Sequence, residues 1–315
     1  MTKLEDSFVE CILKNNIKKA KYIIKLKADV TKGEYQGHTP LMAAVVTENI
    51  EILEIILDNI KGDDEKIACL TATSFERYSP FTKAVATGNS EIIERILDSI
   101  KDKEKRVILA NKSLFYNRRS AISYARNAET VRVLLKSGAD PYLEDDSSFN
   151  AFFWHAHQRR DECIRALTEQ GFDIDKLNSN GNTMLIQGLD YPGDIDTFER
   201  LLANGANVNA QNRNGKTALI KLAENKYNAP QVAQLLFKYK ADVNIEDYAL
   251  GSAIKYAGKY GNFDLAKVLI EHGAKEHNSI GQSIYSYGMI ETYALKIMSM
   301  FRENKILKSK IIKER

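Results

Sequence analysis

The sequence predicts an all-α solenoid of stacked helix–turn–helix units joined by β-hairpin-like loops. A Thr, Ser or Asn that can cap a helix recurs every 30 to 41 residues, an amphipathic segment follows it, and a Gly-Ala pair ends several units. The markers are Thr39, Ser79, Ser120, Asn150, Thr183, Thr217 and Ser252. The chain of 315 residues is also too long for one core, which stops growing at roughly 250–300 residues, and repetition explains that length.

The first half of each unit predicts a short helix opened by its capping residue. Residues 39–44 read Thr-Pro-Leu-Met-Ala-Ala, and residues 79–84 read Ser-Pro-Phe-Thr-Lys-Ala in the same register. An amphipathic segment follows each, over 50–57 and 90–97. The two halves therefore form a pair of helices with a tight connection.

The second half of each unit ends where a left-handed helix cap is needed. Matching ends occur at 134–140, 201–207 and 269–274, and weaker copies at 236–242 and 26–29. Glycine favours the left-handed conformation at that position. Asn-rich clusters with Gly at 178–181 and 212–215 predict the hairpin turns between units.

These registered copies resemble the ankyrin-repeat family, whose unit is about 33 residues long with a Thr-Pro-Leu-His-x-Ala signature. The resemblance covers residues 1 to about 280. Thr-Pro-Leu survives only at Thr39–Leu41, and no unit keeps the His, so seven copies in register carry the likeness. It implies stacked helix pairs that bind other proteins through the inner helices and hairpin tips.

Three segments follow from this register. Residues 1–36 form an N-terminal capping repeat. Residues 37–280 form seven repeats that start near 37, 77, 118, 148, 181, 215 and 250. Residues 281–315 form a C-terminal helical cap and a basic tail.

Some segments depart from the regular unit. The first two of the seven repeats carry inserted helical turns over 61–74 and 101–113, and the third is short by about three residues, which predicts a bend. In the C-terminal cap, Met289, Tyr293, Ile297 and Met300 fall at helical spacing and are expected to cover the end of the stack.

Composition and charge predict a folded cytoplasmic protein. The net charge is +3, and the last 15 residues alone carry six Lys or Arg and two Glu. Three widely spaced cysteines favour a reducing compartment. No apolar run reaches the roughly 20 residues of a membrane span, and the N-terminus lacks the apolar core of a signal peptide. Delivery into a host cell, if the source is an intracellular bacterium, is an alternative location.

No motif predicts catalysis, a cofactor or a metal site. His155 and His157 are two residues apart, so on a helix they do not share a face. The cysteines fall at apolar helix positions, and the Gly33–Gly37 segment lacks the Lys-Ser/Thr of a phosphate-binding loop. The chain is therefore expected not to be an enzyme.

Register predicts a partner-binding face on the inner helices. The position after the signature His is solvent-facing in such repeats, and here it includes Lys83, Tyr124, Trp154, Lys221 and Tyr256. Trp154 is the only Trp, and exposed aromatic residues dominate interface energetics. In the alternative, Trp154 turns inward beside Phe152 and Phe153 and fills the core.

Adjacent hairpin tips supply a second candidate surface. It combines three arginines with two tyrosines, a composition enriched at protein interfaces. The residues are Arg77, Tyr78, Tyr116, Arg118 and Arg119. Because the next tip carries Glu144, Asp145 and Asp146, a protein partner fits better than a nucleic acid, which favours a continuous basic stripe. Solvated loops without a shared role are the alternative.

The tail is the third candidate. It interleaves Lys305, Lys308, Lys310 and Lys313 with Ile306, Leu307, Ile311 and Ile312. Such a segment can bind an anionic membrane surface or an acidic partner, serve as an export signal, or simply end the chain.

The sequence as a whole predicts a monomeric, non-enzymatic scaffold or adaptor for protein–protein interaction, whose partner it does not identify. A secreted bacterial effector that targets host proteins, or a membrane-surface or nucleic-acid-associated protein that uses its basic tail, remain alternatives.

Overall fold

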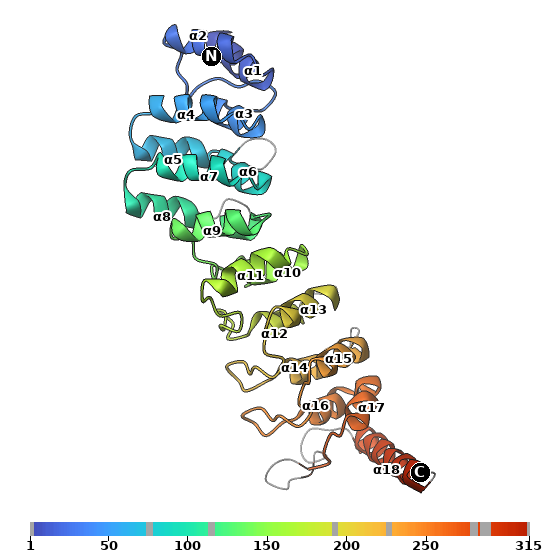
Figure 1. Cartoon of the computed structure of the whole chain (residues 1–315). Helices are drawn as coiled ribbons and strands as arrows, with labels where there is room; N and C mark the ends of the chain where they lie inside the picture. The colour runs from blue at the N-terminus through green and yellow to red at the C-terminus, as the bar shows by residue number, and fades with distance from the viewer. Residues whose placement is uncertain are drawn as a thin grey trace. The chain divides into compact units, whose positions relative to one another are not determined.

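A computed structural model describes residues 3–73, 78–112, 117–190, 195–224, 229–277, 283 and 291–313, and in these ranges it confirms the all-α prediction (Figure 1). These residues contain eighteen α-helices and one short 3₁₀ helix. Extended pairing in the same ranges is limited to isolated bridges, such as Tyr35 with His38 and Glu246 with Ser252 in hairpins. The chain divides into two compact units, 1–172 and 173–315.

Unit 1 consists of helix pairs and two added helices. Its pairs are α1 (Lys3–Leu13) with α2 (Ile17–Lys25), α3 (Pro40–Val46) with α4 (Ile50–Asn59), α6 (Pro80–Thr87) with α7 (Ser90–Asp98), η1 (Ala121–Tyr124) with α9 (Ala128–Lys136), and α10 (Ala151–His157) with α11 (Asp161–Glu169). Several marker residues cap the helices as expected, whereas Ser120 and Ser252 stand at the N-cap without a side-chain capping hydrogen bond. Thr39 Oγ1 accepts a hydrogen bond from the Met42 N–H, and Ser79 forms a reciprocal capping box with Thr82.

The two insertions form separate helices, α5 (Asp63–Thr71) and α8 (Lys103–Asn111). The predicted extra turns are thus present, but extended backbone at Ile60 separates α5 from α4. The Lys66 Nζ donates to the carbonyl of Ser99 at 2.9 Å, and Asn111 Nδ2 donates to the carbonyl of Gly138 at 2.8 Å. The added helices therefore tie one repeat to the next.

Gly138 shows how closely α8 approaches the end of α9. Its φ is +88°, and a Cβ at this position would lie 2.7 Å from Val107 Cγ2. Only glycine satisfies both the left-handed backbone and this contact.

The short third repeat ends its inner helix after one 3₁₀ turn, η1. Carbonyl groups at the end of a helix have no partner within that helix. Arg160, from the following repeat, donates from Nη1 to the carbonyls of Tyr124 at 3.0 Å and Ala125 at 2.7 Å. A side chain of the next repeat therefore replaces the missing turn.

Unit 2 continues the pattern and ends in a long helix. Its elements are α12 (Met184–Gly188) with α13 (Ile195–Ala203), α14 (Ala218–Glu224) with α15 (Ala229–Lys238), α16 (Ala253–Tyr260) with α17 (Phe263–Glu271), and α18 (Glu291–Lys313). The predicted C-terminal cap is confirmed, since α18 buries Ile297 and Phe301 against the core of this unit. Tyr293 and Met300 are half-buried there, and Met289 lies outside the described residues.

His155 is a fully buried titratable residue of unit 1, on α10. Burial, helped by the nearby positive charge of Arg160, lowers the pKa of His155 to about 3. The ring is therefore neutral in the folded chain across the physiological range. His155 is therefore a neutral, buried side chain of the repeat core.

We expect acidification to destabilise unit 1 through His155. The unfolded chain takes up a proton on this ring below about pH 6.5 and the folded chain does not, so the stabilisation is complete above pH 6.5 and is lost as the pH falls toward 3. Between pH 7 and pH 5 the loss is about 2 kcal/mol. Urea unfolding followed by Trp154 fluorescence measures it. His155→Leu is expected to remove this pH dependence and the exposed His277→Gln to keep it, and equal pH dependence in both variants would contradict the assignment.

Candidate partner-binding surface

An Asp or Asn at the start of each of four hairpins fixes the shape of that hairpin. In unit 1, Asp145 Oδ1 accepts hydrogen bonds from the backbone N–H groups of Ser147 (2.9 Å) and Phe149 (3.1 Å). Asn178, Asn212 and Asp247 accept bonds from backbone N–H groups in the same way in unit 2. Such side chains replace backbone partners in a tight turn.

In three of these four repeats, the second polar atom of this side chain reaches the inner helix nine residues later. Trp154 Nε1 donates to Asp145 Oδ2 at 2.9 Å, Tyr256 Oη donates to Asp247 Oδ2 at 2.6 Å, and Asn178 Nδ2 donates to Gln187 Oε1 at 3.0 Å. In the fourth, Asn212 Nδ2 donates instead to Asn182 Oδ1 of the preceding repeat. We call the contact with the inner helix the hairpin–helix bond. Positions that register predicted to face a partner thus also hold the hairpin of their own repeat.

Trp154 adopts the inward orientation that the sequence left as an alternative. Only 9% of its surface is exposed, so its prediction as a solvent-facing anchor is wrong. Asp145 accepts a hydrogen bond from the indole N–H of Trp154. The rings of Phe149 and Phe153 pack edge-on against the indole, with centroid distances of 6.0 and 5.5 Å. The Arg119 guanidinium carbon lies 3.2 Å from the ring centroid and covers the ring face.

Side chains of three neighbouring repeats form cation–π contacts here, with Arg119 on Trp154 and Tyr124 and with Lys83 on Tyr78, whose ring acts electrostatically on Tyr124. We call this set the aromatic–cation cluster. Its members are Tyr78, Lys83, Arg119, Tyr124 and Trp154. The Lys83 Nζ lies 5.3 Å from the ring centroid of Tyr78, and the Arg119 guanidinium lies 5.4 Å from that of Tyr124. Burial raises the pKa of Tyr124 and outweighs the opposing effect of the Arg119 charge, so this phenol stays protonated.

The structure therefore brings together five of the predicted site residues and separates others. Arg118 is exposed and has a left-handed φ of 54°, whereas its neighbour Arg119 turns onto Trp154. Arg77 and Tyr116 lie outside the described residues. The repeat register predicted the inner-helix face and the hairpin tips as two separate surfaces. It did not predict that Arg119 of one repeat contacts Trp154 of the next.

Lys221 and Tyr256 belong to a different patch, in unit 2. Lys221 pairs with Asp190 at 3.0 Å, and Lys216 pairs with Glu224. The Lys216 Nζ also lies 4.9 Å from the ring centroid of Tyr256. Burial and the bond to Asp247 raise the pKa of Tyr256. This patch is polar and its lysines are paired with carboxylates.

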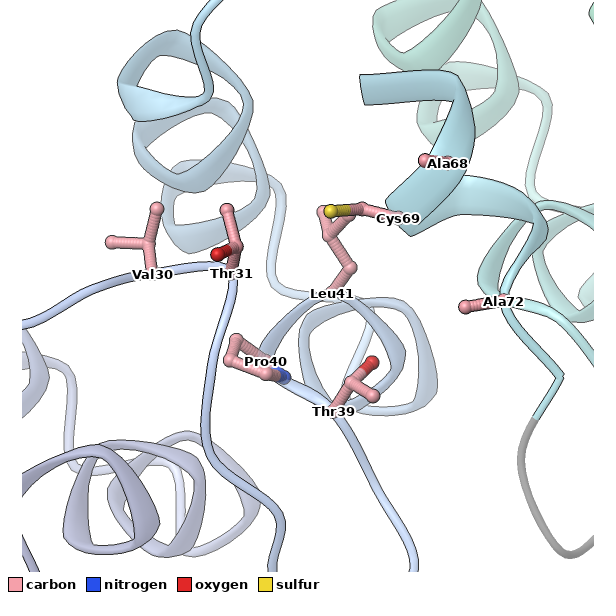
Figure 2. Close-up of a pocket in the computed structure, with 8 residues that line it drawn as sticks. All are labelled: Val30, Thr31, Thr39, Pro40, Leu41, Ala68, Cys69 and Ala72. Carbon is pink, nitrogen blue, oxygen red and sulfur yellow. The ribbon is translucent and has the colours of Figure 1, made fainter. Parts of the chain in front are cut away.

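An apolar pocket of about 260 Å³ lies between α5 and the start of α3 (Figure 2). Its lining residues are Val30, Thr31, Thr39, Pro40, Leu41, Ala68, Cys69 and Ala72. In Figure 2 the sulfur of Cys69 points from α5 toward the loop that carries Val30 and Thr31. Burial raises the pKa of Cys69, so its thiol is protonated near neutral pH and is a poor nucleophile.

None of the helices in the described ranges combines the length and apolarity required to cross a bilayer. Groups of three or more His, Cys, Asp or Glu side chains placed to hold a metal ion are absent from the same ranges.

Comparison with known proteins gives one consistent match. The family model for ankyrin repeats (three copies) matches residues 119–212 and 189–279, together slightly more than half of the chain. The B-cell lymphoma 3 protein homolog of Mus musculus is 30% identical over 151 residues, which are 46% of this chain and 33% of that protein. SH3 and multiple ankyrin repeat domains protein 2 of Homo sapiens is 29% identical over 149 residues, 47% of this chain and 8% of that protein.

One solved structure is similar over most of the chain. The crystal structure of the ankyrin repeat domain of Bcl-3, described as a unique member of the IkappaB protein family, covers 85% of this chain and all of its own, with 21% identity and a TM-score of 0.48. The chain spans a third or less of the length of the two curated relatives described above.

Asp145 is expected to be the residue on which Trp154 most depends. Asp145→Ala leaves two backbone N–H groups and the indole N–H without their acceptor, and the expected loss is about 3 kcal/mol of unfolding free energy. Asp145→Asn keeps an acceptor for the hairpin and is expected to lose about 1 kcal/mol. Urea unfolding measures both.

The adjacent Asp146 provides the matched control, because its side chain is exposed. Asp146→Ala is expected to change the unfolding free energy by less than about 0.5 kcal/mol. A similar loss in Asp145→Ala and Asp146→Ala would show that the hairpin–helix bond does not stabilise the repeat.

Proposed function

Because the chain belongs to the ankyrin-repeat family, whose repeat domains are generally protein–protein interaction modules, we propose that it is a non-enzymatic scaffold or adaptor that binds another protein. The aromatic–cation cluster of unit 1 is the observation that carries this proposal. It gathers aromatic and cationic side chains from three repeats, and these residue types are enriched in interface hot spots.

Within this cluster we assign the direct contacts to the half-buried members. Tyr78, Lys83 and Tyr124 retain exposed surface, whereas Trp154 is nearly covered and supports them from below. We place the exposed Arg118 at the edge of the same surface. Lys221 and Tyr256 form a second, separate contact patch in unit 2.

The charge of the region favours a protein partner of mixed charge over a nucleic acid. Lys83 and Arg119 are followed along the chain by Glu144 and Asp146, so the cations do not form a continuous stripe. A cytoplasmic location is consistent with the three cysteines, Cys11, Cys69 and Cys163, which are all free thiols.

We predict that Tyr124→Ala combined with Lys83→Ala weakens partner binding at least about tenfold, because it truncates the accessible aromatic residue and an accessible cation of the cluster. Affinity capture from a lysate of the source cells, followed by mass spectrometry and titration of the captured protein, measures the effect.

Tyr22→Ala is the matched control for this change. Tyr22 is 61% exposed on α2 of the same unit but lies outside the cluster. Its variant is expected to capture the partner like the parent chain. Unchanged capture by the Tyr124 and Lys83 double variant would contradict the assignment of this surface.

The end of α18 supports a second candidate function, contact with an anionic membrane surface. Ile306 and Leu307 are 56% and 58% exposed, and Lys305, Lys308 and Lys310 are exposed on the same helix. Apolar and basic side chains together favour binding at an anionic lipid surface.

Replacement of Lys305, Lys308 and Lys310 by Gln tests this candidate. We expect it to reduce sedimentation with phosphatidylserine-containing vesicles by at least about fivefold, since each lysine contributes about 1 kcal/mol near such a surface. Replacement of Lys18, Lys19 and Lys25 on α2 by Gln is the matched control and should leave sedimentation unchanged. No sedimentation of the parent chain would overturn this candidate.

A further inference from the structure

We propose that Trp154, Tyr124 and Asp145 form a binding site for a guanidinium side chain of the partner protein, and that Arg119 of the chain itself occupies this site in the unbound state. We call these three residues the cation site. The proposal rests on the proposed function, because it names the chemistry that the interaction surface recognises.

The position of Arg119 shows that the site accepts a guanidinium group. Its guanidinium carbon lies 3.2 Å from the Trp154 ring centroid and 5.4 Å from that of Tyr124. Planar guanidinium groups stack on aromatic faces and are less strongly hydrated than ammonium groups. The same geometry is open to an arginine of another chain once Arg119 leaves.

Asp145 supplies the rigidity of the site. Only 7% of its surface is exposed. Its Oδ2 fixes the indole through the Trp154 N–H, while its Oδ1 accepts bonds from the hairpin backbone. The ring face that meets the cation is therefore held in place whether or not Arg119 covers it.

The residue that fills the site and the two aromatic residues that form its walls lie on different kinds of element. Tyr124 ends η1 and Trp154 lies within α10, whereas Arg119 lies in the hairpin before η1, next to the left-handed Arg118. Hairpin segments rearrange at lower cost than packed helices. Arg119 can thus leave while the walls of the site stay folded.

An intramolecular arginine competes with the partner. A tethered group has an effective concentration on the order of millimolar, so a single free guanidinium compound binds poorly to the parent chain. A partner must offer an arginine together with further contacts on Tyr78 and Lys83. Arg119 therefore selects against isolated cations and in favour of a complete interface.

Removal of Arg119 tests the proposal without any protein partner, because Trp154 is the only Trp in the chain and its fluorescence reports on this site alone. In full-length Arg119→Ala we expect acrylamide quenching of Trp154 to rise about twofold, because the ring face is uncovered. N-ethylguanidinium chloride, titrated to about 20 mM against NaCl at equal ionic strength, is expected to reverse this quenching with saturation.

Further variants separate the contributions. Arg165→Ala, at an exposed arginine of α11 outside the cluster, is the matched control and should behave like the parent chain, which shows neither change. Arg119→Gln keeps a side chain over the ring and serves as a second variant if Arg119→Ala unfolds. Arg119→Ala combined with Asp145→Asn should lose the response to N-ethylguanidinium.

A folded Arg119 variant with increased quenching but no saturable response to N-ethylguanidinium would overturn the cation site. So would a variant whose Trp154 quenching equals that of the parent. Either result, together with capture that still depends on Tyr124, would leave the proposed function intact. A saturable response in a chain that captures no protein would instead support the site and contradict the proposed function.

Discussion

The hairpin–helix bond is the interaction on which the candidate surface depends. A repeat presents its hairpin and its inner helix to the same side, but two short elements joined by a turn have no fixed relative position by themselves. One Asp or Asn side chain solves this, because one of its polar atoms binds the turn backbone and the other binds a side chain of the inner helix. The same bond recurs at Asp145, Asn178 and Asp247, in repeats with quite different inner-helix residues.

Contacts between consecutive repeats then determine which side chains can meet. In repeat proteins, stability is largely the sum of the units and the interfaces between neighbours. Here polar contacts between neighbours supplement the apolar core. Lys66 of one insertion reaches the Ser99 carbonyl, and Arg160 completes the end of η1 in the preceding repeat. The stacking of Arg119 on Trp154 belongs to the same class of contact, except that it lies at the surface.

Helix caps and the periodic features of the repeats were predictable from the sequence, whereas contacts between repeats were not. The caps at Thr39 and Ser79 and the capping role of Ile297 follow from spacing alone. The repeat register also predicted the side of the helix on which Trp154 lies, but it did not predict how exposed the side chain is. That exposure depends on Asp145, nine residues earlier, and on Arg119 of the preceding repeat. The contact with Asp145 had a signal in the sequence, namely an Asp or Asn nine residues before a Trp, Gln or Tyr. The contact with Arg119 had no such signal, since packing determines which side chain of another repeat a residue contacts.

The same spacing explains why the inner helices differ in what they can offer a partner. Ala43 occupies the equivalent position in an earlier repeat and is fully buried, and the residue nine positions before it is Glu34, not Asp or Asn. In the repeat of Asn212, the hairpin has an Asn but the bond is replaced, because Asn212 donates to Asn182 and Lys221 pairs with Asp190. Stability and recognition are thus coupled at Trp154, Gln187 and Tyr256, because a side chain that turned outward to meet a partner would release its own hairpin. A partner can then use such a residue only through the face of its ring, and in unit 1 Arg119 covers that face of Trp154.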